Sequence, residues 1–394
     1  MTPVEAATVA DTITLQALSD DPYPIYAALR RTAPVAWVPA LGMWIVTRYD
    51  DVRVVLLDSE TFVTGTDASL IYQTFGAQML ACEGEQHQRQ RQPWLNGAFM
   101  PAGLGDALQT SLVARTAQLL DAIVPKRRIE FRQAFAARLP VLVMLDLFGL
   151  PDDAETPMRA WYDSFEAALS RGGEASIHAA RAADAFHALV QSEIDASRAG
   201  RGRGGLLQAF MDRPAETRLA DDEIRRNALI LFFGGISTVE AVILNLLWAL
   251  LRHPPAIQRV RDERPRLDAA FDETMRWVSP VQSATRHTVR ASQIAGVEIP
   301  AGTTVNCMLG SANRDETMFG APDAFDLDRP NARQHLGFAA GPHFCLGRHL
   351  ARAEALVALN GLLDRTQSLR LEAPTIGPSG HEFRRPQSLW LEWD

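Results

Sequence analysis

The segment from Phe338 to Gly347 constrains this chain more than any other, because a cysteine, a phenylalanine and two glycines stand in it at fixed offsets directly before a predicted helix. The cysteine is Cys345, and the helix is expected to begin near Leu346 and to run to about Leu363. From average residue frequencies, such a match arises by chance in roughly one chain in a thousand. A helix N-terminus lowers the pKa of a thiol through its positive potential and its free N–H groups. The segment therefore predicts a thiolate ligand.

An iron porphyrin accounts for this combination of residues. Gly341 and Gly347 allow the backbone to pass close to a flat macrocycle, and Phe338 can cover the sulfur. Sulfur donation to iron favours cleavage of the O–O bond. The alternative is a buried structural cysteine, which is the usual fate of a lone cysteine. We expect that structural role for the other two cysteines of the chain, Cys82 and Cys307, whereas the surrounding pattern favours the ligand in this segment.

The segment resembles the cysteine-ligand loop of the cytochrome P450 family, and the resemblance extends over essentially the whole chain. It implies haem b held by Cys345, with O2 bound on the opposite face, in a single haem domain that covers residues 1–394. The implied fold is mainly α with small β-sheets, and a long central helix crosses the distal face of the haem. Helical periodicity indeed dominates residues 85–209, and a long helix is expected from about Asp221 to Leu251. Short strands are expected near residues 35–38, 43–47, 285–289, 297–299, 303–308 and 389–393.

The middle of the long helix carries two adjacent glycines, Gly234 and Gly235. Each glycine inside a helix costs about 1 kcal/mol, so either close packing or a local opening is expected there. In the cytochrome P450 family this helix widens at that point and oxygen sits in the groove. The resemblance implies that Thr238 hydrogen-bonds the oxygen and helps to carry protons.

The residue before that threonine is commonly acidic in the family, but here it is Ser237. Glu240 cannot simply replace the acid, because two residues along a helix turn the side chain by about 200° relative to Thr238. We therefore expect proton delivery to use Ser237, Thr238 and ordered water. The alternative for Ser237 is a hydroxyl that bonds back to a helix carbonyl.

Four cationic side chains are candidates for binding the two propionates of the haem. His87 and Arg91 are four residues apart and therefore share a helix face. The resemblance implies that these two, together with Arg286 and His343, contact the propionates. The alternative for each of them is an ordinary surface position.

Glu273 and Arg276 place an acid and an arginine three residues apart on one helix face. The alternative is a solvated surface pair, worth under about 1 kcal/mol. Their position about seventy residues before the cysteine follows the order of the family, and Arg329 then resembles the third partner of a structural cluster behind the cysteine segment. Breaking a buried network of that kind costs about 3–5 kcal/mol.

A basic window surrounds the cysteine, because residues 331–353 contain no aspartate or glutamate although the whole chain has a formal net charge of −8. It predicts an acidic electron-transfer partner, either a ferredoxin or a flavin and iron–sulfur reductase. The stretch around Ser237 also resembles, more weakly, the haem domains of self-sufficient P450–reductase fusions, so this partner is either separate or originally fused. The alternative is that the cations serve the propionates and helix carbonyls. The window contains Arg333, His335, His343, Arg348, His349 and Arg352, of which we expect Arg348 and Arg352 to dock the partner.

The resemblance implies a monooxygenase that inserts one oxygen atom from O2 into a small apolar or aromatic substrate, by hydroxylation or O-dealkylation, with electrons from NAD(P)H. Tyr72 and Gln282 are candidate polar anchors in a mostly apolar pocket. Its candidate walls are residues 68–80, 165–169, 231, 234, 235 and 278–284. Three alternatives stay open: a peroxide-driven peroxygenase, a haem-thiolate sensor or binding protein, and a protein whose cysteine segment is purely structural.

Composition bears on the partners and on the compartment. The acidic balance argues against nucleic acid as a partner. Since no stretch of about 18 uncharged apolar residues occurs, we expect no membrane span. The acidic start, with Asp11, Asp20 and Asp21, lacks the pattern of a secretory signal. Three widely spaced thiols favour a reducing cytoplasm.

Overall fold

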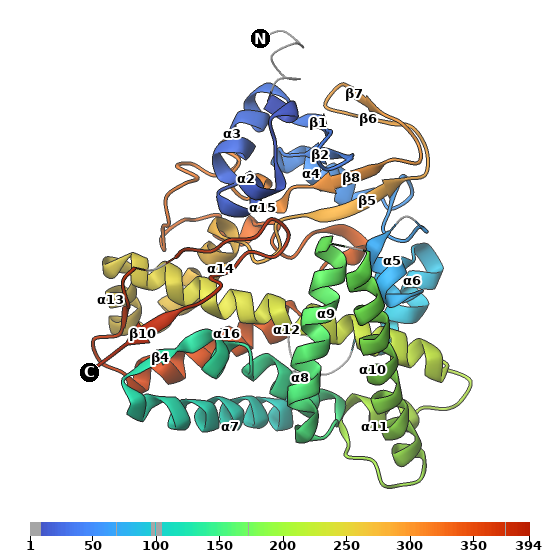
Figure 1. Ribbon diagram of the computed structural model, residues 1–394, viewed down its shortest axis with the longest axis vertical. Coiled ribbons are helices and arrows are strands. Elements are labelled where there is room, and N and C mark those ends of the chain that lie inside the picture. The colour runs from blue at the N-terminus through green and yellow to red at the C-terminus, as the bar shows by residue number, and fades with distance from the viewer. Residues whose placement is uncertain (1–8, 68, 96–98, 100–104, 172, 375) are drawn as a thin grey trace.

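Helices make up most of the chain that the computed structural model describes, namely residues 9–394 without 68, 96–98, 100–104, 172 and 375 (Figure 1). This confirms the predicted class, mainly α with small sheets. The longer helices are α7 (Gly105–Ile123), α8 (Leu139–Phe148), α9 (Glu155–Arg171), α10 (Glu174–Arg198), α12 (Asp221–Arg252), α14 (Arg266–Trp277) and α16 (Arg348–Arg365). The shorter helices are α2 (Leu15–Asp20), α3 (Tyr23–Thr32), α4 (Tyr49–Leu57), α5 (Leu70–Phe75), α6 (Gly84–Arg91), α11 (Gly205–Met211), α13 (Pro254–Asp262) and α15 (Leu309–Ala312).

The central helix α12 has close to the predicted bounds. Acidic side chains in its first turn complement the helix dipole. Pro254 ends it, because a proline nitrogen cannot donate to the carbonyl four residues earlier. The helix runs across the middle of the molecule and packs against α8, α10, α14 and α16 (Figure 1). Among the described residues it alone is long and apolar enough to cross a membrane, yet 78% of its most apolar window is buried inside the protein, as expected of a core helix.

Three small sheets accompany the helices. The largest has the strand order β1-β2-β8-β5-β3, in which only β2 and β8 run parallel. The others are β4-β10-β9 and the pair β6-β7. The sequence does not predict β3, β4, β6 and β9, because two or three residues show too little alternation. The strands are β1 (Val35–Val38), β2 (Met43–Val46), β3 (Phe62–Val63), β4 (Arg128–Glu130), β5 (Ala284–Thr288), β6 (Ser292–Ile294), β7 (Val297–Ile299), β8 (Thr304–Cys307), β9 (Arg370–Leu371) and β10 (Trp390–Glu392).

The five-stranded sheet and the helices α2, α3, α4 and α15 form one end of the molecule, at the top of Figure 1. The large apolar core around α12 forms the other part, with α7, α8, α10 and α16. Residues 313–347 connect α15 in the first part to α16 in the second. The cysteine segment therefore lies at the junction of the two parts.

Candidate active site

The cysteine segment folds as a tight loop before α16. Cys345 lies three residues before the first residue of that helix, so the helix begins slightly later than predicted, and Gly347 is its N-cap. The Cys345 N–H donates to the Phe338 carbonyl over 3.0 Å, which closes the loop on itself. At Gly341 the backbone φ is +73°, and a Cβ there would lie 2.3 Å from the carbonyl oxygen of Leu56. Glycine is therefore required at 341 by close packing against α4, which is a different reason from the one the sequence predicted.

The thiol of Cys345 is only half-buried by surface area, but its titration is dominated by burial. Burial raises the pKa of the Cys345 thiol, while N–H groups of Gly347 and Arg348 and the charges of Arg91 and Arg348 offset part of that rise. The N–H groups at the helix terminus therefore lower the pKa of the thiol as predicted, but burial outweighs them and the net shift is upward. A sulfur that coordinates a metal cation loses its proton outright. The N–H groups of Gly347 and Arg348 and the charges of Arg91 and Arg348 would stabilise a negatively charged, metal-bound sulfur more than a neutral thiol.

The two glycines of α12 have opposite surroundings, and the predicted close packing is found at Gly235. No atom lies within 4 Å of the position that a Cβ would take on Gly234, and this residue is exposed although its neighbours in the core helix are buried. A Cβ on Gly235 would instead lie 3.0 Å from the sulfur of Met144 on α8. Gly234 thus borders open space, and Gly235 allows two helices to pack.

The two hydroxyls that follow these glycines have different partners. Thr238 is half-buried, and its Oγ1 donates to the Gly234 carbonyl over 2.6 Å. Ser237 is fully buried, and its Oγ accepts from Arg385 over 3.2 Å. A hydrogen bond from the hydroxyl to a helix carbonyl was the alternative expected for Ser237, but it is Thr238 that makes one. The lone pairs of the Thr238 oxygen remain available.

His87 and His343 come together, with ring centroids 4.4 Å apart. His343 Nε2 lies 2.7 Å from one carboxylate oxygen of Glu83. The other oxygen of Glu83 accepts from the N–H and the hydroxyl of Thr64. Among the described residues, His87 Nε2 and His343 Nδ1 are buried without a hydrogen-bond partner. Burial, then the charges of His343 and Arg91, lower the pKa of His87 to about 4. Glu83 was missed by the sequence reasoning, and only its place four residues before His87 hinted at it.

Arg286 lies on β5 with its side chain buried. Its one hydrogen bond among the described residues goes to the carbonyl of Thr285, and no carboxylate of these residues pairs with it. Arg91 donates to the Phe344 carbonyl. A buried cation without a counter-anion is costly, so the site lacks negative charge. The two carboxylates of a haem would supply negative charge beside Arg286 and would accept hydrogen bonds from the two unpartnered imidazole nitrogens. The residues present therefore fit that group.

Glu273, Arg276 and Arg329 form a buried ion-pair cluster rather than a solvated pair. Arg276 donates twice to Glu273, over 2.8 and 2.7 Å, and Arg329 Nε lies 3.1 Å from the same carboxylate. Arg276 and Arg329 also donate to backbone carbonyls of Asn313, Pro322 and Ala324, among others. The cluster therefore fixes the connection that leads from α15 to the cysteine segment.

The basic window is less basic in three dimensions than in sequence. Two aspartates of α14, Asp268 and Asp272, form ion pairs with Arg352, and Asp272 also pairs with Arg333. Arg348 is not paired with an acid among the described residues, and it lies 4.8 Å from the ring centre of Phe344. Phe344 is 36% exposed. A smaller cationic and aromatic surface therefore remains beside Cys345.

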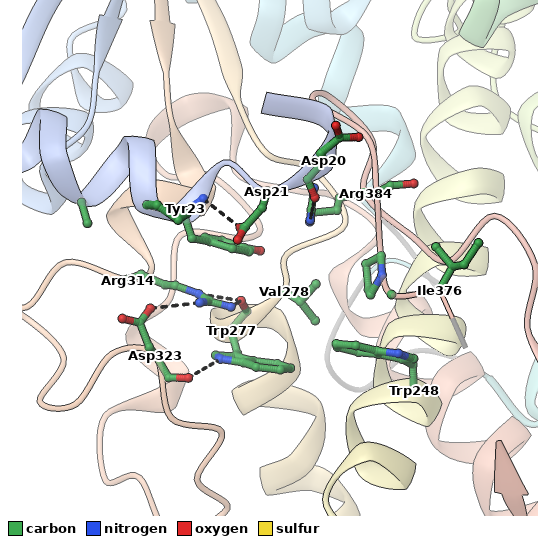
Figure 2. A pocket seen from close by; sticks show the side chains of 15 residues that line it. Asp20, Asp21, Tyr23, Trp248, Trp277, Val278, Arg314, Asp323, Ile376 and Arg384 are labelled. Atoms are coloured by element: carbon green, nitrogen blue, oxygen red, sulfur yellow. Dashed lines mark hydrogen bonds and ion pairs between the residues drawn. The ribbon is translucent and has the colours of Figure 1, made fainter. Parts of the chain in front are cut away.

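A separate pocket of about 780 Å³ lies between α2, α3, the end of α14 and residues 376–379 (Figure 2). Val278 is the only residue from the predicted pocket walls that lines it. Its charged groups are engaged internally: Arg314 pairs with Asp323 and stacks on Tyr23, and Arg384 donates to backbone carbonyls. This pocket is a junction that anchors α3, and it contains none of the predicted haem contacts.

Gln282 is fully buried; its Nε2 donates to the Ser279 carbonyl, and its Oε1 has no hydrogen-bond partner among the described residues. Of the other predicted pocket walls, residue 68 lies outside the described residues. An aromatic group surrounds Phe233, the residue before Gly234: Phe75, Tyr162 and Phe383 have ring centroids 4.9, 5.4 and 5.9 Å from it. The residue before Gly234 on α12 therefore belongs to an aromatic group.

Comparison with known proteins gives the family. A sequence profile described as Cytochrome P450 matches residues 152–375. The chain is 32% identical to the cytochrome P450 monooxygenase PikC of Streptomyces venezuelae, over 91% of this chain and 86% of that protein. It is similar to the crystal structure of P450BioI in complex with an acyl carrier protein ligated to hexadec-9Z-enoic acid (TM-score 0.85, 29% identity, 95% and 98% coverage). It is also similar to CYP109E1 from Bacillus megaterium in complex with testosterone (TM-score 0.83, 26% identity, 95% and 99% coverage). The chain therefore belongs to the cytochrome P450 family and is a monooxygenase that uses haem and O2.

Proposed function

We propose that Cys345 is the axial ligand of a haem b iron, and that the protein inserts one oxygen atom into a small apolar or aromatic substrate by hydroxylation or O-dealkylation. The observation that carries this proposal is a set of buried groups near the cysteine segment that lack a partner: the Arg286 side chain pairs with no carboxylate of the described residues, and His87 Nε2 and His343 Nδ1 have no hydrogen-bond partner among them. Haem propionates supply two such anions.

The residues divide by the part of the haem that they would contact. Cys345 would bind the iron, with Phe338, Gly341 and Gly347 on the same side. His87, Arg91, Arg286 and His343 would hold the propionates, and Gly234 would border the opposite face, whereas Gly235 packs against Met144 of α8. When bound, the haem supplies the activation of oxygen.

Thr238 and Ser237 would manage protons on that face. Since the Thr238 hydroxyl donates to the Gly234 carbonyl, its oxygen can accept a hydrogen bond from water or from a bound molecule. Turning the hydroxyl away from that carbonyl would release its proton toward the open space beside Gly234. A substrate packed against the aromatic rings grouped around Phe233 would keep water away from these hydroxyls and limit the loss of protons to solvent.

Two observations support an apolar substrate. Phe233, the residue before Gly234, is grouped with the aromatic rings of Phe75 and Phe383. The similar structures hold a fatty acyl chain and testosterone, and both molecules are largely apolar.

We also propose that electrons come from NAD(P)H through an acidic partner, a ferredoxin or a flavin and iron–sulfur reductase, in the cytoplasm. Arg348, His349 and the exposed ring of Phe344 would form the docking surface beside Cys345. Arg352 contributes less than the sequence predicted, because Asp268 and Asp272 offset its charge.

The test is a spectral titration of the haem-loaded protein with a library of small apolar compounds, followed by turnover of the hits under oxygen-18. The proposal predicts a shift of the iron from low to high spin and one labelled oxygen atom in the product. A peroxygenase would form product with hydrogen peroxide as fast as with the full electron chain, and a sensor would bind compounds without turnover. Label that comes only from water would refute oxygen insertion from O2.

A further inference from the structure

A network of buried charges surrounds Ser237, on the side of α12 that carries Glu240. Arg385 donates to both carboxylate oxygens of Glu166 on α9, over 2.8 and 3.0 Å, and to Ser237 Oγ over 3.2 Å. Arg385 Nε also lies 3.4 Å from Glu240, and Arg132 donates to the same Glu240 carboxylate. The side chains of Arg385 and Glu240 are only 6% and 5% exposed.

Helix geometry explains why Glu240 belongs to this network. Residues three apart on a helix are neighbours on one face, so Glu240 is placed beside Ser237. The sequence argument compared Glu240 with Thr238, two residues away, and correctly placed it on another side. The relevant neighbour of Glu240 is Ser237. The carboxylate of Glu240, one turn later on the same face, therefore lies beside the position where the chain has a serine in place of an acid.

Stability does not account for such a network. Replacing a buried ion-pair group by well-packed apolar residues is often neutral or stabilising, so burial of four charges next to Ser237 calls for another role. The network also reaches the surface, since the side chains of Glu166 and Arg132 are 20% and 17% exposed. Asp163, one turn before Glu166 on α9, is exposed.

We propose that Glu166, Glu240 and Arg385 form a relay that brings protons from solvent through Ser237 to Thr238, in place of the acid that position 237 lacks. The inference rests on the proposed function. Arginine keeps its proton, so Arg385 fixes the geometry and the carboxylates carry the proton. Ser237 Oγ accepts from Arg385 and can therefore donate its own proton onward.

The proton balance is simple. A carboxylate oxygen of Glu166 or Glu240 takes a proton from water and passes it, through water or rotation of its side chain, to Ser237 Oγ. Ser237 releases its original proton to an ordered water that passes a proton on to Thr238 Oγ1, because adjacent side chains on a helix do not face each other. The network then has its starting charge, and one proton has moved inward. Tyr162, which also borders the network, stays neutral because burial raises its pKa well above the usual value.

The experiment uses the haem-loaded full chain with Glu240→Gln and Glu166→Gln. Glu193→Gln is the matched control, because Glu193 is equally buried, at 3% exposure, and pairs with Arg203 away from Ser237. Product formation should fall about 100-fold in Glu240→Gln, the lower end for loss of a positioned proton donor. The control should keep the wild-type rate. The infrared stretch of carbon monoxide bound to the reduced protein should shift in Glu240→Gln and not in Glu193→Gln.

A rescue separates the relay from a structural role. Ser237→Asp combined with Glu240→Gln moves the carboxylate by one turn and should restore most of the lost product formation. Unchanged product formation in both Glu240→Gln and Glu166→Gln, or a rescue variant as slow as Glu240→Gln at equal stability in urea, would overturn the proposal. If Glu240→Gln fails to fold, Glu166→Gln at the edge of the network decides alone. If the visible absorption spectrum of the carbon monoxide complex is normal in these variants, the proposed haem site is intact and only the relay has failed.

Discussion

Gly234→Ala and Gly235→Ala are one chemical change at neighbouring positions of one helix, yet the structure predicts different outcomes. Alanine in place of glycine stabilises a helix interior by about 1 kcal/mol. The new methyl group meets no atom within 4 Å at position 234. Gly234→Ala should therefore raise the free energy of unfolding by about 1 kcal/mol.

At position 235 the methyl group would lie 3.0 and 3.1 Å from the sulfur and terminal carbon of Met144. That side chain is flexible and can move, but leaving its preferred rotamer costs about 0.5–1.5 kcal/mol. This cost cancels the gain in helix propensity. Gly235→Ala should therefore leave the free energy of unfolding nearly unchanged.

Two assays check the pair on haem-loaded protein without substrate. Urea unfolding measures the stability difference, and flash photolysis measures the rate at which carbon monoxide rebinds. If the open space beside Gly234 is the oxygen side of the haem, the methyl group of Gly234→Ala should slow rebinding and that of Gly235→Ala should not. Equal stability gains in the two variants, or slower rebinding in Gly235→Ala than in Gly234→Ala, would refute the reasoning.

Three further predictions concern the haem contacts and the ion-pair cluster. Glu273→Gln should lower the free energy of unfolding in urea by about 3–5 kcal/mol, because two buried arginines lose their shared counter-charge; a loss under about 1 kcal/mol would show that the cluster is solvated. Arg286→Ala should speed transfer of haem to an apoprotein acceptor by about 10- to 150-fold, since a charged hydrogen bond contributes about 1.5–3 kcal/mol, whereas Arg290→Ala, a change at a 60% exposed arginine nearby, should not. In the protein without haem the pKa of His87 is lowered from 6.5 to about 4, so the unfolded chain binds the proton more readily, and the stability of the haem-free protein should fall as the pH drops through this window. His87→Gln should make the free energy of unfolding, measured in urea, depend less on pH between about 4 and 6.5. An unchanged pH dependence would contradict the lowered pKa of His87.

The features that the sequence predicted well are local. The bounds of α12 follow from acidic residues at its start and a proline after its end. The cysteine segment is recognisable because its residues lie within ten positions of one another. Four strands of two or three residues, β3, β4, β6 and β9, were missed, since so short a run carries little pattern, whereas the equally short β7 and β10 were predicted.

The features that escaped prediction depend on partners far away in the chain. Ser237 lies 148 residues from Arg385, and His343 lies 260 residues from Glu83. The basic window around the cysteine is partly neutralised by Asp272, 80 residues before Arg352. Gly341 is required by the carbonyl of Leu56, which no reading of the loop itself could reveal. A window of sequence shows charge and periodicity, but it does not show which distant side chain completes a site.

The most direct test of the central claim is the absorption difference spectrum of the reduced protein with and without carbon monoxide, for the wild type and for Cys345→Ser. Sulfur ligation predicts the strongly red-shifted band of a thiolate-bound haem in the wild type and its loss in the serine variant. The same band in both proteins, or its absence from a haem-replete wild type, would contradict a bond between Cys345 and iron.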